Sequence, residues 1–147
     1  MHDYDTLNEA YGQMRKRYAA FFSDDFPYWN LSYPLGWHPR VMQLLDDITV
    51  ALPPEHLARF RIFQIKEKFG GLRLYFEVRS AHSSDGDGDG DSAPSEDDVP
   101  FPAQIVRDLI DAANEDCNHI CQRCGQEGVL AEERGWWRVL CYPCSRK

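Results

Sequence analysis

The sequence has no long hydrophobic run. The apolar stretch at 48–52 is followed by Pro53, and the stretch at 60–65 is interrupted by Arg61 and Gln64. Both are far shorter than the roughly 20 apolar residues that a membrane-spanning helix needs. The first residues also lack the basic and then apolar stretches of a secretory signal. We therefore expect a cytoplasmic protein without a membrane partner.

Catalytic signatures are also scarce. The five histidines are scattered along the chain. No glycine-rich phosphate loop follows a strand pattern, and no serine, threonine or cysteine lies in a nucleophile motif. A general base cannot be paired with an orienting carboxylate from such a pattern. The sequence leaves enzymatic activity open, but it favours a non-enzymatic protein over a nuclease-like enzyme.

The negative charge is unevenly distributed. The formal net charge is −8, yet residues 80–98 alone carry seven acidic side chains and no lysine or arginine. Residues 59–79 carry six basic side chains against two acidic ones, and residues 118–147 carry five against three. We expect residues 82–100 to form a flexible acidic linker, because so polar a segment buries too little apolar surface to fold.

The acidic linker also resembles a calcium-binding loop. The positions of the D-x-D-x-D-G-x₅-E pattern are taken by Asp85, Asp87, Asp89, Gly90 and Glu96. No helical pattern flanks the segment, and an Asp-Gly repeat matches such a motif readily by chance. Calcium at 85–96 is therefore a secondary hypothesis.

Four of the five cysteines form two C-x-x-C pairs near the C-terminal end. Cys121 and Cys124 are followed, after sixteen residues, by Cys141 and Cys144. In a reducing compartment such pairs more often bind a metal than form disulfides, and this spacing is typical of Cys₄ zinc sites. Disulfides or an iron centre are the alternatives. We predict a zinc ribbon at 118–147, with a structural ion because four thiolates close a tetrahedral shell.

Two further donors lie beside the predicted ligands. Cys117 is interpreted as a small buried apolar residue at the end of a helix. His119 is interpreted as a solvent-facing or supporting group and not as a ligand. Whether either replaces one of the four cysteines is left open.

The remaining patterns predict an α+β fold. A capping box from Thr6 to Glu9 opens a first helix, Pro39 lies in the first turn of a second, and Pro102 opens a third that ends near Cys117. The inner face of the third helix is predicted to contain Ile105, Val106, Leu109, Ile110 and Ala113.

Two strands are predicted between the second and third helices. Apolar and polar residues alternate at 72–79, and apolar residues of both parities at 60–66 indicate a central strand or a bulge. Gly70 and Gly71 suit the turn between them. We expect a core at 1–81 with helices packed on this small antiparallel hairpin or sheet, and a helix at 101–117 packed on that core.

The segment at 64–75, QIKEKFGGLRLY, resembles a group of small bacterial and phage proteins. Those proteins carry a Q-(I/V)-K-E-K-F-G-G-L-R-F-Y segment and a C-terminal zinc ribbon. The resemblance covers roughly residues 35–145 apart from the acidic insertion. It implies the fold and the metal and no particular activity. The group often has histidine where this chain has Cys144, so the fourth ligand departs from its pattern.

Two regions are candidates for a binding surface. Lys66, Lys68 and Arg73 surround the Gly-Gly turn, unless the lysines pair with glutamate across the hairpin. In the aromatic loop at 26–37, Trp29 is either a core plug or part of an interface.

Two binding functions follow from these patterns. The first is a protein-binding module, such as a bacterial immunity or inhibitor protein that neutralises a toxin, because acidic proteins associate rapidly with basic partners. The second is a nucleic-acid-binding protein that uses the basic hairpin and stacks Trp136 on bases.

Overall fold

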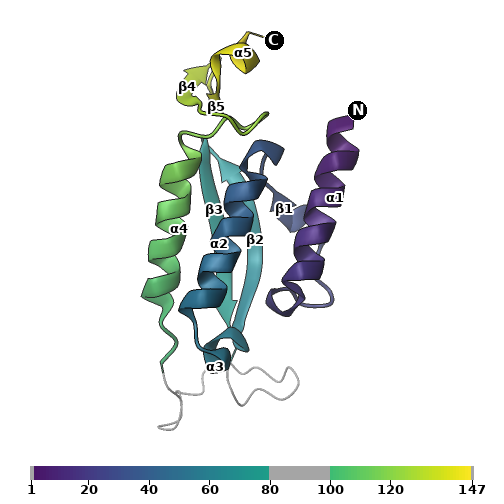
Figure 1. Ribbon diagram of the computed structural model, residues 1–147, viewed down its shortest axis with the longest axis vertical. Coiled ribbons are helices and arrows are strands. Elements are labelled where there is room, and N and C mark those ends of the chain that lie inside the picture. Colours follow the sequence, from purple (N-terminus) through teal and green to yellow (C-terminus); the bar gives the residue numbers. More distant parts are fainter. Residues whose placement is uncertain (1, 80–99, 147) are drawn as a thin grey trace.

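Helices packed on one face of a three-stranded sheet, followed by a two-stranded ribbon, give the chain an α+β fold (Figure 1). The computed structural model describes residues 2–79 and 100–146. Its elements, in chain order, are α1 (His2–Arg17), η1 (Ala19–Phe21), η2 (Tyr28–Asn30), β1 (Leu31–Ser32), η3 (Leu35–Trp37), α2 (His38–Ala51), α3 (Pro54–Leu57), β2 (Phe60–Lys68), β3 (Gly71–Val78), α4 (Ala103–Cys117), β4 (Val129–Glu133), β5 (Trp136–Leu140) and α5 (Tyr142–Ser145).

The calcium pattern at 85–96 and the predicted linker apart from Pro100 lie outside the described residues. Among the helices of the two described ranges, none is long and apolar enough to cross a membrane.

β2 is the central strand of the larger sheet. It pairs with β3 in an antiparallel register that shifts between Ile62 and Gln64, so the strand is both central and bulged. On its other side it pairs in parallel with β1, where Leu31 lies opposite Ile65. The hairpin and its irregularity were predicted from the sequence. The two-residue strand β1 was not predicted, because it carries too little periodicity to be recognised.

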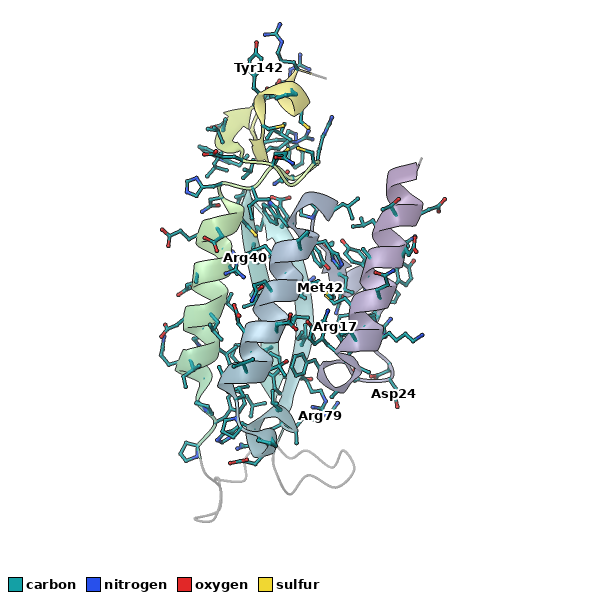
Figure 2. The ribbon with its side chains drawn as sticks, in the orientation of Figure 1. Arg17, Asp24, Arg40, Met42, Arg79 and Tyr142 are labelled. Atoms are coloured by element: carbon teal, nitrogen blue, oxygen red, sulfur yellow. The ribbon has the colours of Figure 1, made fainter. Side chains whose placement is uncertain are left out.

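The core lies between the sheet and the helices. In Figure 1, α2 lies across β2 and β3, with α4 and α1 on either side of it. The apolar side of α2, which consists of Val41, Leu44, Leu45 and Ile48, is fully buried. Arg40 on α2 donates to Asp116 on α4 over 2.7 Å, and Figure 2 shows Arg40 between these two helices. Within residues 2–79 and 100–146, no helix packs on the opposite face of the sheet, which is called the uncovered face below.

Two details of the predicted helices are wrong. α1 begins at His2, so Thr6 lies inside the helix and is not its cap. The helix ends at Arg17, and Tyr18 and Phe21 are buried in the turn that follows. On α4, Ile105 is exposed and not part of the inner face, whereas Val106 and Ala113 are buried as predicted.

His38 gives the fold a measurable dependence on pH. Its Nδ1 lies 2.8 Å from the hydroxyl of the buried Tyr33, and burial lowers the pKa of His38 below the ordinary 6.5. A histidine whose pKa is lower in the folded state contributes stability above about pH 6.5 and loses it as the pH falls toward the folded-state pKa. As the pH is lowered, we expect the free energy of unfolding to decrease more for the wild type than for the His38→Gln variant. Urea denaturation between about pH 5 and 8 measures this, and equal losses would contradict it.

Candidate metal centre

Tight backbone turns position the first cysteine pair. The N–H of Gly125 donates to the carbonyl of Cys121 over 3.0 Å, and Gly125 has a φ of +81°, which a side chain would disfavour. The N–H of Cys121 in turn donates to Gln126 over 2.7 Å. This loop brings the two sulfurs of the C-x-x-C pair to the same side of the chain.

The second pair lies at the other end of the ribbon hairpin. β4 and β5 pair across Arg134 and Gly135, and both residues have positive φ. β5 then leads into the single turn α5, where the N–H of Ser145 donates to the carbonyl of Cys141 over 2.9 Å. The hairpin thereby returns Cys141 and Cys144 to the first pair.

The four sulfurs converge on one point. The Sγ atoms of Cys121, Cys124, Cys141 and Cys144 all lie within 4.8 Å of one another, and these cysteines form no disulfide. Sulfurs of a tetrahedral zinc site lie about 3.8 Å apart, given Zn–S bonds of about 2.3 Å. The Cys124–Cys141 pair at 3.5 Å is too long for a disulfide and close to that spacing. The group is therefore compatible with a structural metal ion such as zinc.

The protonation of the sulfurs also suits a cation. Burial raises the pKa of Cys121, but the backbone N–H groups of Cys124, Cys141 and Arg123 outweigh it and lower the value to about 6. The neighbouring Cys141 thiol and burial raise the pKa of Cys144 to about 12. Hydrogen bonding among the sulfurs thus favours one thiolate beside protonated neighbours, and a bound cation would replace the protons that those neighbours share.

The two spare donors lie outside the sulfur cluster. Cys117 is fully buried in the main core, and burial raises the pKa of its thiol to about 12. This is the environment of an inert apolar cysteine, as predicted. His119 is exposed, and its carbonyl accepts the N–H of Gly128. The structure brings neither residue into the group of four.

The ribbon is joined to the core through η3, and the sequence did not predict this contact. The N–H of Gly36 donates to the carbonyl of Gln122, and the indole N–H of the fully buried Trp37 donates to the carbonyl of Ile120, both over 2.8 Å. A Cβ at position 36 would lie 2.1 Å from the carbonyl oxygen of Cys121. A glycine beside a tryptophan is consistent with close packing, but this pattern does not show that the first cysteine loop is the segment packed against it.

The turn of the β2–β3 hairpin also contacts the ribbon. Phe69 and Gly70 have φ values of 55° and 80°, which form a two-residue turn of type I′. A Cβ on Gly70 would lie 2.3 Å from Leu130 and 3.5 Å from Trp137. The glycine therefore serves both the turn and the close approach of β4 and β5.

The predicted binding residues are divided among three places. Lys66 and Arg73 are direct cross-strand partners on the uncovered face of the sheet, and Lys68 lies on that face beside the turn. Trp29 is exposed at the other side of the sheet, next to α1. Trp136 is exposed on the face of the ribbon opposite to that of Trp137, and therefore away from the turn between β2 and β3.

A groove of about 810 Å³ runs between α1 and residues 28–34. Its lining is mostly apolar and consists of Leu7, Asn8, Tyr11, Gly12, Arg15, Tyr28, Trp29, Leu31, Ser32, Tyr33, Pro34 and Glu67. The aromatic loop thus has two roles: Trp37 and Tyr33 are buried, whereas Tyr28 and Trp29 stay exposed beside the groove.

Comparison with family models, curated proteins and solved structures finds no match to this chain. The resemblance of residues 64–75 to the bacterial and phage group is therefore still a prediction.

Proposed function

We propose that the chain is a non-enzymatic protein-binding module, stabilised by zinc, whose groove holds an apolar segment of a partner protein. An immunity or inhibitor protein that neutralises a toxin would act in this way. Zinc is the proposed metal because tetrahedral four-thiolate sites select zinc or iron–sulfur centres. Four thiolates leave no open position for a catalytic water.

The observation that supports this proposal is the exposed aromatic pair beside the groove. Tyr28 is 73% exposed and Trp29 66% exposed, and their rings pack edge to face with centroids 5.2 Å apart. Each ring exposes apolar surface that costs free energy in water. Tyrosine and tryptophan are also the residues most enriched among those that dominate protein–protein binding energy.

The lining of the groove indicates the chemistry of its occupant. Leu7, Tyr11 and Leu31 offer apolar contacts, while Arg15 and Glu67 add one charge of each sign. An amphipathic helix or an extended segment with a few large apolar side chains fits such a lining. A small polar substrate would leave most of this surface unused.

A photo-crosslinking experiment tests the proposal. A benzophenone amino acid in place of Trp29 is expected to link one partner protein in cells that produce the chain, whereas the same group in place of Val50 is not. Val50 is a matched control because it is 87% exposed on α2, away from the groove lining. Equal labelling from both positions, or none from position 29, would contradict the proposal.

Affinity for the linked partner provides the second measurement. Trp29→Ala is expected to weaken binding by about thirtyfold or more, which is the loss of a residue worth about 2 kcal/mol. Val50→Ala should leave the affinity unchanged. Because Trp29 is exposed, its loss should also leave the thermal stability of the free chain nearly unchanged.

A further inference from the structure

The uncovered face of the sheet carries a concentration of positive charge. Its side chains alternate with the buried ones and come from Arg61, Gln64, Lys66, Lys68, Arg73, Tyr75 and Glu77. Within residues 2–79 and 100–146, the ion pairs join Arg17 or Arg40 to aspartates and involve no cation of this face. Arg61 lies opposite Glu77 and donates to the carbonyls of Ala58 and Phe60. In the described part of the chain, the ammonium and guanidinium groups of Lys66, Lys68 and Arg73 have no such acidic partner and are available to an outside anion.

One cross-strand pair on this face is unfavourable for stability alone. Lys66 lies directly opposite Arg73, and like charges in that position destabilise a sheet. Glu67 does not compensate, because it pairs with Leu72 on the other face and accepts the N–H of Gly70 over 2.8 Å. The alternative in which lysine pairs with glutamate across the hairpin is therefore not what the structure shows.

Exposed aromatic rings accompany these cations. The amine of Lys66 lies 5.6 Å from the ring centroid of Tyr75, and the amine of Lys68 lies equally far from that of Phe69. Phe69 is 69% exposed, and its φ is 55°. Positive φ is uncommon for bulky residues, and type I′ turns favour Asn or Gly there. Neither core packing nor turn formation explains a phenylalanine at this position.

We propose that this face binds single-stranded nucleic acid, with Lys66, Lys68 and Arg73 contacting phosphates and with Tyr75 and Phe69 stacking on bases. Alternating cations and open aromatic rings on a sheet are the two elements of sequence-tolerant single-strand binding. A duplex hides the faces of its bases and cannot use the rings. The formal charge of −8 does not argue against this, because residues 80–98 supply seven of the acidic side chains and the rest of the chain is nearly balanced.

An acidic protein segment is the competing partner, and it fits less well. Such a segment would gain most by pairing as an additional strand at a sheet edge. At the β3 edge, however, the N–H of Leu72 already donates to the Asn114 side chain of α4 over 2.8 Å. Carboxylates would also leave the exposed rings of Tyr75 and Phe69 without a stacking partner.

Fluorescence anisotropy with labelled oligonucleotides tests the proposal on the full zinc-loaded chain. The probes are oligothymidylate and oligouridylate of about 12 nucleotides, within the site sizes of single-strand binding folds, with a duplex of equal length and polyglutamate as competitors. We expect binding of one or both single strands, weaker binding as salt rises, and poor competition by both competitors. No binding at low salt, or equal competition by polyglutamate, would overturn the proposal.

Matched variants locate the site. Lys66→Gln is expected to weaken binding about fivefold near 0.1 M salt, because each lost phosphate contact lowers the salt slope by about 0.7 on single strands. Lys16→Gln removes the same charge from α1 and should change neither affinity nor slope. Tyr75→Leu keeps apolar bulk but removes the stacking surface, so binding should weaken at least about fivefold. Equal effects of the two lysine variants would overturn the assignment of the face.

Phe69 supplies a test that a purely structural role cannot imitate. Phe69→Asn places a residue that tolerates positive φ in the turn, so the chain should keep or gain thermal stability. Its affinity for the single strand should nevertheless fall at least about fivefold. A variant that is both as stable and as tightly bound as the wild type would show that Phe69 takes no part in binding.

Discussion

Removal of the metal is expected to unfold residues 118–146 while the three-stranded sheet and its helices stay folded. The buried cluster at the centre of the ribbon consists of the three cysteines 121, 141 and 144 with Leu140 packed against them, and every residue of β4 is exposed. So small a cluster cannot offset the loss of chain entropy, whereas zinc contributes about 10–16 kcal/mol in comparable peptides.

Hydrogen exchange before and after chelation measures this effect peptide by peptide. Amides at 120–128 and 136–141 should lose their protection, while those at 60–78 should keep theirs. Elemental analysis of the purified chain should give about one zinc ion per chain, as one set of four thiolates requires. A chain that carries no metal, or a ribbon that is equally protected after chelation, would contradict the assignment.

Two cysteine variants separate the metal from packing. Cys124 is exposed, so Cys124→Ser should unfold the ribbon through loss of a ligand and not through a cavity. Cys117 is buried in the main core and lies outside the four-sulfur group. Cys117→Ala should therefore lower the stability of the whole chain modestly and retain the metal. If both variants lost the ion, the assignment of Cys124 as a ligand and of Cys117 as a core residue only would be wrong.

The features that the sequence predicted correctly depend on local patterns. The two C-x-x-C pairs and their spacing predicted the sulfur group and the ribbon that carries it. Alternation at 72–79 and the mixed parity at 60–66 predicted a bulged central strand, because side chains of a strand face opposite sides in turn. Each of these signals lies within 24 residues of chain or fewer.

The features that the sequence could not predict depend on contacts between distant segments. Trp37 donates to Ile120, which is 83 residues away, and the approach of Gly36 to Cys121 spans a similar distance. Neither leaves a periodic pattern. The uncovered face of the sheet could not be predicted either. A single sequence shows which side chains share a face but not which face the helices cover.

The positions where local rules fail are those to which binding is assigned. Stability alone does not favour two cations opposite each other, a phenylalanine at positive φ, or two aromatic rings in water. All three occur at the surface of this chain, while its core follows the expected patterns closely. Such conflicts are expected at functional sites, because a binding surface is selected for its ligand and not for the isolated fold.

The attachment of the ribbon to the core gives the last prediction. Gly36→Ala is expected to destabilise the zinc-loaded chain by about 3 kcal/mol, because the added methyl group would lie 2.1 Å from the carbonyl oxygen of Cys121 and 2.7 Å from that of Gln122. To relieve this overlap, the first cysteine loop must move away and lose its hydrogen bond from Gly36. Zinc affinity should then fall by about tenfold or more, since the loop carries two of the four ligands.

Gly12→Ala is the matched control for this substitution. A Cβ at Gly12 would have no neighbour within 4 Å, and alanine is favoured over glycine inside a helix by up to about 1 kcal/mol. The same chemical change should therefore stabilise the chain at position 12 and destabilise it at position 36. Both free energies follow from urea denaturation with zinc present, and zinc affinity follows from competition with a chromophoric chelator. If Gly36→Ala kept both its stability and its zinc affinity, the ribbon could not be held against the core in the way that the Gly36 and Trp37 contacts require.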